Sequence, residues 1–435
     1  MDFLNLISLV GLFVLGGMAW GIGGLRRPVQ IRTLLGSALM MVFFGGLIFL
    51  VPPIRLVLLR VDNLVVSLLG VARHGAEFLF GPLALNPGEM TTSQEPSVGF
   101  IMAAQVLPAV IFFSALMMGA YYFGVIQPVI RLFARLFQKS LRLSGLEALA
   151  GSSNIFLGIE SFMTVRPYLS EMTRSELLTL LTCGMSTVAS TTLALYVFFL
   201  KDSFPQIAGH LISASILSIP AAILVSKLIL PETQQPKTLG ELPEIQDFEQ
   251  HGNLMAALTA GSWDGIKLAA GITGLLVALL GVVGILDLAL VQLTSPIAGW
   301  LGGEVLSLDR ILTWVFTPFA WLLGVGNSDL NTTAQLLGKR LLLTEMVAYK
   351  QLGELAASQQ VSSRTLLILS YALCGFAHVA SMGIFVGGIS ALVPSRREDL
   401  SNLALRALIG ATLATLMTGA LAGLFFYGQT TVLGL

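Results

Sequence analysis

A motif that occurs twice in apolar surroundings constrains the fold of this chain more than any other feature. Residues 183–190 (CGMSTVAS) recur as 374–381 (CGFAHVAS), with five of the eight positions identical. A lone glutamate precedes each copy inside an apolar segment, Glu160 in the first case and Glu345 in the second. Membrane carriers built from two repeats bind their cargo where interrupted, polar-bearing segments of the two halves meet. The repeat therefore predicts a secondary transporter with its site at the repeat interface.

Composition indicates a membrane protein. Hydrophobic residues make up 55% of the chain and charged residues 11%, whereas soluble domains carry about 25% charged residues. The formal net charge is zero, which gives no reason to expect a nucleic-acid partner. Cys183 and Cys374 lie inside apolar segments, so we expect packing residues and neither a disulfide nor a metal site.

Apolar runs of about 20 residues predict eight transmembrane helices. They cover residues 4–24, 33–52, 101–126, 176–200, 207–230, 268–294, 364–392 and 403–427. Arginine and lysine follow the first, third and seventh runs, which predicts that these loops are cytoplasmic and that both chain ends face outward. The stretch 129–139 places its basic residues on one helical face and predicts an amphipathic helix at the cytoplasmic interface. We expect a multi-pass protein of the bacterial inner membrane.

Two further segments, 146–172 and 311–352, are apolar on both sides of a polar break. We interpret both as re-entrant helical hairpins, which persist at membrane depth only where protein or a watery cavity covers them. Three full spans separate the hairpins, so they open to opposite sides. The predicted fold is an all-α polytopic membrane protein with an inverted-topology repeat.

The predicted organisation has four parts. An N-terminal scaffold covers 1–100, the first repeat covers 101–230, a polar cytoplasmic linker covers 231–260, and the second repeat covers 261–435.

Glu160 and Glu345 are each predicted near a hairpin tip. A charge at membrane depth costs at least about 2.5 kcal/mol, so we expect each carboxylate to accept hydrogen bonds from a polar substrate. The alternative is a structural carboxylate that caps a half-helix. The matching places in the two repeats favour the substrate role.

Small polar residues accompany the glycines of the repeated motif. Gly184 and Gly375 weaken their helices, and an unwound helix frees carbonyl oxygens that suit a sodium ion. The polar residues concerned are Thr187, Val188 (through its carbonyl), Ser190, His378 and Ser381, and Asn154 with the Leu157 carbonyl could complete a sodium site. The alternative for the Ser and Thr residues is a hydrogen bond back to their own helix. For His378 three roles stay open: it binds substrate, it titrates in a proton-coupled cycle, or it cross-links helices. His74, His210 and His251 are expected at surfaces or interfaces.

The chain resembles the concentrative nucleoside transporter family nearly from end to end. The resemblance rests on the stretches Gln105–Pro108, Ser153–Gly158, Arg166–Leu169, Met172–Leu177, Thr344–Tyr349, Tyr371–Ala377 and Pro394–Arg397. It implies a homotrimer with eight spans per subunit, two opposed hairpins, and nucleoside uptake driven by sodium or protons.

The resemblance also implies roles for individual residues. The substrate set would be Gly158, Ile159, Glu160, Ser161, Glu345, His378 and Ser381, and the sodium ligands would be Asn154, Leu157, Thr187 and Val188. This chain departs from the family at the first tip, where Gly158-Ile159-Glu160, followed by Ser161, stands in place of Gly-Gln-Thr-Glu. One residue and the glutamine amide are missing, while the glutamate remains. His378 also replaces the family's ribose-contacting asparagine.

The favoured function is sodium-coupled nucleoside import with no resident cofactor. The alternatives are proton-coupled nucleoside import and the same fold carrying another polar metabolite. A channel or a membrane scaffold is disfavoured because the polar residues gather at two breaks and do not form a continuous pore. An enzyme is disfavoured because no nucleophile–base pair is visible.

Overall fold

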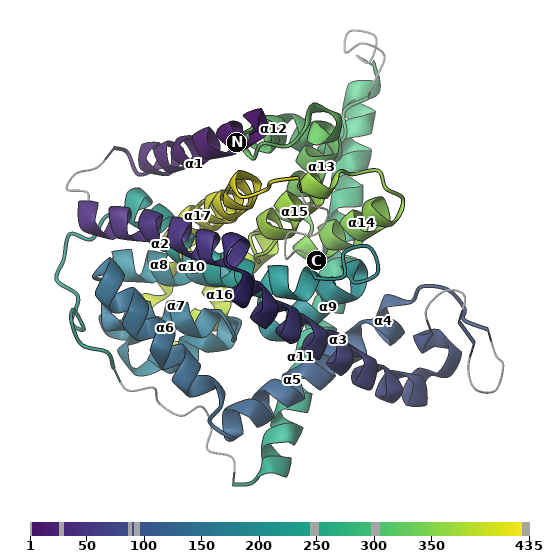
Figure 1. The fold of residues 1–435 in the computed structure, drawn as a ribbon, viewed down its shortest axis with the longest axis horizontal. Coiled ribbons are helices and arrows are strands. Elements are labelled where there is room, and N and C mark those ends of the chain that lie inside the picture. Colours follow the sequence, from purple (N-terminus) through teal and green to yellow (C-terminus); the bar gives the residue numbers. More distant parts are fainter. Residues whose placement is uncertain are drawn as a thin grey trace.

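The computed structural model describes residues 2–25, 30–85, 89–90, 96–243, 252–296 and 305–428, without the side chains of Ile159 and Glu160. Within these ranges the regular elements are helices (Figure 1), which confirms the all-α prediction. The shorter ones include the 3-10 helices η1 (Gly81–Ala84) and η5 (Pro394–Arg396), and α4 (Met102–Gln105).

Most of the predicted spans are found as long apolar helices. The uninterrupted ones are α1 (Phe3–Ile22), α2 (Ile31–Leu50), α10 (Ile207–Ile229), α11 (Leu254–Thr294) and α17 (Arg397–Leu424). Another span consists of α4 followed by α5 (Leu107–Tyr122). Counting α8 and α9 together, seven stretches of the described chain are long and apolar enough to cross a membrane. The span predicted at 364–392 is not among these seven stretches, because a break divides it into two short helices.

Both copies of the repeated motif interrupt a helix. In the first repeat α8 (Arg174–Ser186) gives way to extended backbone at Thr187 before α9 (Ser190–Leu200). In the second, α15 (Ser363–Ala372) and α16 (Val379–Leu392) are separated by residues 373–378. The two breaks touch: a Cβ added at Gly375 would lie 2.9 Å from the carbonyl oxygen of Ser186. Glycine is therefore required there for the close approach of the two backbones.

A helical pair precedes each interrupted helix. In the first repeat α7 (Gly145–Asn154) turns into η2 (Ile159–Glu171), which matches the predicted range 146–172. In the second repeat the pair is α13 (Leu330–Leu342) and α14 (Glu345–Ala357).

The range predicted for the second hairpin, 311–352, began too early. Its first part is a separate helix, α12 (Leu308–Leu322). The polar residues that follow form η4 (Asn327–Asp329), which connects α12 to α13. Gly324 enables this turn with a φ of +77°, which a side chain would disfavour. The hairpin turn itself lies at Leu343 and Thr344, where the Thr344 hydroxyl caps α14.

Two amphipathic helices lie before and within the first repeat. The helix predicted at 129–139 is α6 (Ile126–Leu141), which buries Ile130 and Phe137 while Arg131 and Lys139 stay exposed. Sequence analysis missed α3 (Pro52–Phe80), whose charged positions obscured a helix of 29 residues.

The predicted linker 231–260 is partly helical. Residues 230–243 lie along the start of α7, where the Gly145 N–H donates to the carbonyl of Thr238 at 2.9 Å, and α11 already begins at Leu254.

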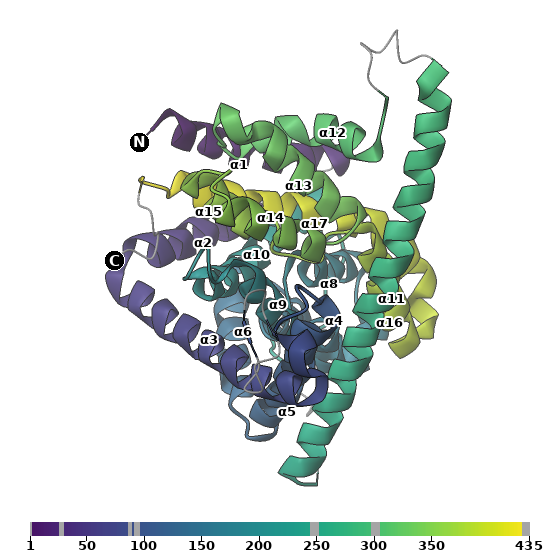
Figure 2. The same cartoon turned by 90° about the vertical axis from the view of Figure 1, so that its right-hand side faces the viewer.

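The most buried helices are α8, α10 and α17, which pack on one another at the centre. The 41 residues of α11 run along one side of the molecule instead (Figure 2). At 1.5 Å per residue this helix is about 60 Å long, roughly twice the hydrocarbon thickness of a bilayer. Its apolar surface faces outward along most of its length and contacts α5 and the site described next.

Candidate functional site

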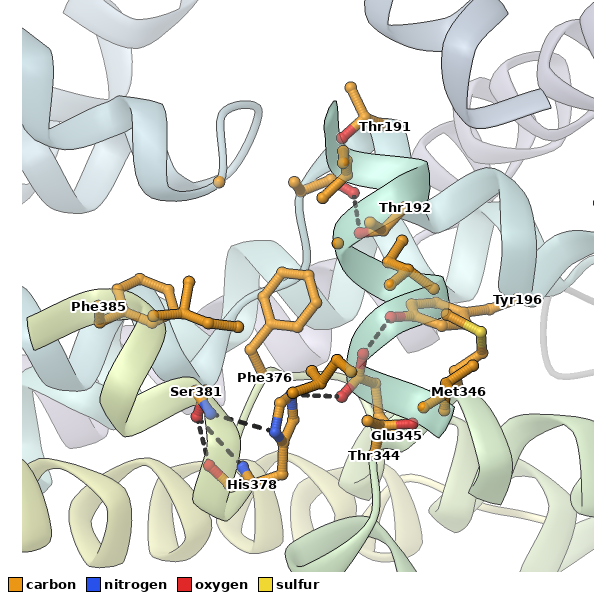
Figure 3. A pocket seen from close by; sticks show the side chains of 18 of the residues that line it. Thr191, Thr192, Tyr196, Thr344, Glu345, Met346, Phe376, His378, Ser381 and Phe385 are labelled. Carbon is orange, nitrogen blue, oxygen red and sulfur yellow. Dashed lines mark hydrogen bonds and ion pairs between the residues drawn. The ribbon is translucent and has the colours of Figure 1, made fainter. Parts of the chain in front are cut away.

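A cavity of about 330 Å³ lies where α9, α11, the start of α14 and the start of α16 meet (Figure 3). The polar side chains that line it are Thr191, Thr192, Tyr196, Thr344, Glu345, His378 and Ser381, with Lys267 from α11. The apolar wall comes mainly from α11 (Leu268, Ile272, Leu275, Leu276) and from Phe376, Ile384 and Phe385. A concave, largely apolar cavity with a few converging polar groups is typical of small-molecule sites.

Glu345 is the acidic group of this cavity. It is the first residue of α14, and the carboxylate is only 2% exposed. A helix N-terminus stabilises a negative charge. The Tyr196 hydroxyl donates to Oε1 at 2.7 Å, whereas no described group donates a hydrogen bond to Oε2. One carboxylate oxygen is therefore held in place, whereas the other makes no well-aligned hydrogen bond within the described part of the chain.

His378 lies beside Oε2, with its Nε2 at 3.2 Å from that oxygen. The ring also caps α16: the Ser381 N–H donates to Nδ1 at 3.2 Å, and the Ser381 hydroxyl donates to the His378 carbonyl at 2.5 Å. Because Nδ1 accepts a hydrogen bond, the proton of the neutral ring is on Nε2. His378 thus places an N–H donor against Glu345 Oε2, and both residues line the cavity.

The predicted residues of the first hairpin tip divide into three groups. Gly158 lines the cavity. The side chains of Ile159 and Glu160 lie outside the described part of the chain. Ser161 is fully buried, and its hydroxyl donates to Asn154 Oδ1 at 2.9 Å, so it supports Asn154 and does not line the cavity.

The four predicted sodium ligands lie on two segments that meet. Asn154 ends α7 and Leu157 follows in the hairpin turn, while Thr187 and Val188 form the break after α8. The segments are joined where the Ser190 N–H and hydroxyl donate to the Phe156 carbonyl, at 3.3 and 2.5 Å. Asn154, Thr187 and Val188 are buried, and the bonds between Ser190 and Phe156 hold their two segments together.

Thr187 also makes the bond to its own helix that was considered from sequence as the alternative to sodium binding. Its hydroxyl donates to the carbonyl of Cys183, one turn earlier, at 2.9 Å. Such a bond leaves the hydroxyl oxygen able to accept or to ligate, because the oxygen keeps its lone pairs.

Comparisons with known proteins decide the family. The pattern described as "Na+ dependent nucleoside transporter C-terminus" matches residues 210–423, its N-terminal counterpart matches 10–83, and "Nucleoside recognition" (Gate) matches 103–203. The chain belongs to the concentrative nucleoside transporters. This agrees with the resemblance seen in the sequence and makes the protein a multi-pass membrane transporter and not an enzyme.

Relatives of this transporter are similar over nearly their whole length. An "Uncharacterized transporter" of Haemophilus influenzae is 33% identical over 97% of each chain. The "Putative nucleoside permease NupX" of Escherichia coli is 32% identical over 96% of this chain and 98% of its own. Among solved structures, CNTnw in an inward-facing substrate-bound state is 33% identical, covers 97% of this chain and 98% of its own, and has a TM-score of 0.85. A CNTnw variant in an outward-facing state gives 0.86, with 33% identity and 98% of both chains covered.

The transporter site contains residues that sequence analysis did not select. Tyr196 lies six residues beyond the repeated motif in an apolar helix, where a buried hydroxyl needs a partner, and that need was its only signal. The α11 wall had no signal, since any apolar span could supply it. His210 was expected at a surface or interface but is fully buried, with Nδ1 3.1 Å from the Tyr371 hydroxyl.

The two cysteines of this transporter are free and buried. This agrees with the packing role predicted for both.

Proposed function

We propose that this chain is a sodium-coupled nucleoside symporter that imports its substrate by alternating access of the two repeats. The observation that carries the proposal is the buried pair of Glu345 and His378 at the cavity, in which Oε2 makes no well-aligned hydrogen bond and lies 3.2 Å from His378 Nε2. An acceptor beside a donor is what a sugar hydroxyl requires, because a hydroxyl both donates and accepts.

The cavity suggests how a nucleoside would lie. A ribose hydroxyl would donate to Glu345 Oε2 and accept from His378 Nε2. The base would then rest against Phe376 and the apolar side chains of α11. We propose Gly158, Ile159, Glu160 and Ser161 as the first-repeat contribution to substrate binding, with Ser161 acting through Asn154.

We propose that sodium binds between the first hairpin turn and the break of α8. Asn154 Oδ1 and the Thr187 hydroxyl would contribute side-chain oxygens, and Leu157 and Val188 would contribute carbonyls. Asn154 Oδ1 already accepts one hydrogen bond from Ser161, which fixes its orientation and leaves a second lone pair. The description of the matching family as sodium dependent supports this choice of ion.

The test is uptake of labelled uridine and adenosine into liposomes under an imposed sodium or proton gradient. Sodium-driven accumulation that Asn154→Ala weakens supports the proposal. Asn402→Ala is the matched control, since Asn402 is exposed on α17. Accumulation that follows only the proton gradient would overturn sodium coupling, and failure to take up either nucleoside would point to another polar metabolite.

We also propose a homotrimer. Native mass spectrometry of the purified transporter in detergent measures the subunit number directly, and a monomer or dimer would contradict it.

A further inference from the structure

A second cavity, of about 600 Å³, lies between the start of α2, the end of α6 and the segment that follows α10. It shares no lining residue with the cavity at Glu345. The two helices touch here, because a Cβ added at Gly36 would lie 2.9 Å from the carbonyl oxygen of Ser140. Arg32 lies one turn before Gly36 on α2, and Arg142 directly follows α6. Both arginines line the cavity.

The cavity gathers hydrogen-bond donors that lack acceptors. Arg32 and Arg142 are exposed, and neither makes an ion pair or a hydrogen bond within the described part of the chain. The amide nitrogen Nε2 of Gln138, a third lining residue, is buried and finds no acceptor among the described residues either. A buried donor without a partner is costly. Two guanidinium groups and an amide therefore indicate an anionic ligand, and arginine binds phosphate through two parallel hydrogen bonds.

Carboxylates in the adjoining cavity do not fill this role. That cavity shares Arg142 and is also lined by Glu147, Glu232 and Lys227. The Nζ of Lys227 lies 2.5 Å from Glu147 Oε1 and 3.9 Å from Glu232 Oε2, and all three residues are buried. Glu232 also accepts the hydroxyl of Thr173 at 2.6 Å. The two carboxylates are thus held by other groups, and the charge of the two arginines stays unmatched.

The surface of α6 indicates that the anion belongs to a lipid. One face of this helix packs into the protein, and the remaining surface has an apolar side and a basic side. The exposed apolar positions are Val129, Leu132 and Leu136, and the exposed basic positions are Arg131, Arg135 and Lys139. A helix with such faces lies in the plane of the membrane interface. Arg142 follows at its end, so the cavity is placed at the level of the lipid headgroups.

We propose that this cavity binds the phosphate headgroup of an anionic phospholipid from the leaflet predicted to be cytoplasmic. Arg32 and Arg142 contact the phosphate oxygens, and the Gln138 amide donates to one of them. The acyl chains leave the cavity past Ile31 and Leu239, which are exposed apolar residues of its wall. Basic pockets between helices on the cytoplasmic side are suited to anionic headgroups.

The experiment counts lipid adducts on the purified full chain by native mass spectrometry in a neutral detergent. The probes are phosphatidylglycerol and phosphatidylcholine with the same acyl chains. Wild type should bind phosphatidylglycerol more tightly, because only this lipid carries a net negative charge. One arginine at the membrane surface corresponds to about a fivefold difference in affinity. Arg32→Gln and Arg142→Gln should therefore each weaken binding of phosphatidylglycerol by about this factor and leave phosphatidylcholine binding unchanged.

Arg142→Gly separates binding from folding. Arg142 has a φ of +51°, a left-handed conformation that glycine adopts without steric cost. This variant should melt no lower than wild type in lipid-free detergent and still lose affinity for phosphatidylglycerol. Arg397→Gln is the matched control, because Arg397 is an exposed arginine on the side predicted to be cytoplasmic but does not line the cavity. It should keep the wild-type affinity.

Three results would overturn the proposal. One is equal affinity of wild type for the two lipids, and another is wild-type binding of phosphatidylglycerol in both Arg32→Gln and Arg142→Gly. The third is displacement of phosphatidylglycerol by an equal concentration of inorganic phosphate, which would assign the cavity to a free phosphate. None of these measurements depends on nucleoside transport.

Discussion

Glu345→Gln tests the site most directly. The substitution keeps the shape of the side chain but removes the negative charge of the carboxylate that lines the cavity. Hydrogen bonds to charged groups contribute about 1.5–3 kcal/mol, and 1.4 kcal/mol is a factor of ten in affinity. Losing one such bond from a ribose hydroxyl should therefore weaken nucleoside binding about 10-fold to 150-fold.

The assay is equilibrium binding of adenosine and 3′-deoxyadenosine to wild type and variant, arranged as a thermodynamic cycle. If the 3′-hydroxyl donates to Glu345, removing the hydroxyl weakens binding to wild type but costs Glu345→Gln much less. Glu354→Gln is the matched control, because Glu354 lies on the same helix but is exposed. Equal losses for the deoxy analogue in wild type and variant, or wild-type affinity in Glu345→Gln, would refute the assignment.

Three further predictions follow from the same contacts. Asn154→Ala should raise the sodium concentration for half-maximal uptake with little change in expression, and an unchanged sodium dependence would contradict the sodium site. Tyr196→Phe removes only the bond to Oε1, so uridine affinity should fall less than in Glu345→Gln, by about 3-fold to 10-fold, as titration calorimetry can measure. Gly375→Ala should lower the melting temperature because its Cβ meets the Ser186 carbonyl, at a cost of about 1–3 kcal/mol. Gly383→Ala, with open space around it, should not.

Substrate selection should be stricter for the sugar than for the base. The sugar would meet two fixed polar groups, Glu345 and His378, whereas the base would meet the mainly apolar wall of α11 and Phe376. A site that hydrogen-bonds a substrate group strongly rejects analogues that lack it. Uptake should accept both uridine and adenosine and fall sharply for uracil. Competition by uracil equal to that by uridine, or strict refusal of all but one base, would show the opposite.

Sequence analysis predicted the parts of the fold that depend on long apolar runs and on the repeated motif. The break after α8 and the break after α15 followed from Gly184 and Gly375 in the two copies. The start of the second hairpin could not be predicted, because α12 is also apolar and the polar residues 327–329 resemble a hairpin turn. Only the packing of Gly324 and the cap at Thr344 distinguish the two turns.

Part of the site followed from sequence because Glu345, His378 and Ser381 belong to, or precede, the repeated motif. Tyr196 lies outside it, and its role depends on which helices the fold brings together. It bonds Glu345, which lies 149 positions later in the chain. No spacing rule connects such positions, so these contacts required the three-dimensional arrangement.

The two repeats share one more device, at the start of each interrupted helix. Thr173 caps α8 and its hydroxyl donates to Glu232 at 2.6 Å, whereas Ser362 caps α15 and its hydroxyl donates to Asp329 at 2.7 Å. Burial raises the pKa of Asp329, but hydrogen bonds from Thr365, Ser362 and Ser328 outweigh it and leave the pKa below its ordinary value.

Because the pKa of Asp329 is depressed, its hydrogen bonds stabilise the fold at pH values above the ordinary carboxyl pKa. This stabilisation is lost as the pH falls through the pKa of the folded state. A buried carboxylate therefore accepts a hydrogen bond at the base of each hairpin. The turn of each hairpin, at Gly158 or at Thr344, borders the cavity. A carrier must change conformation around its substrate while its fold stays intact. We therefore expect the movable parts of this transporter to lie at the two turns and the two helix breaks, next to the proposed substrate site.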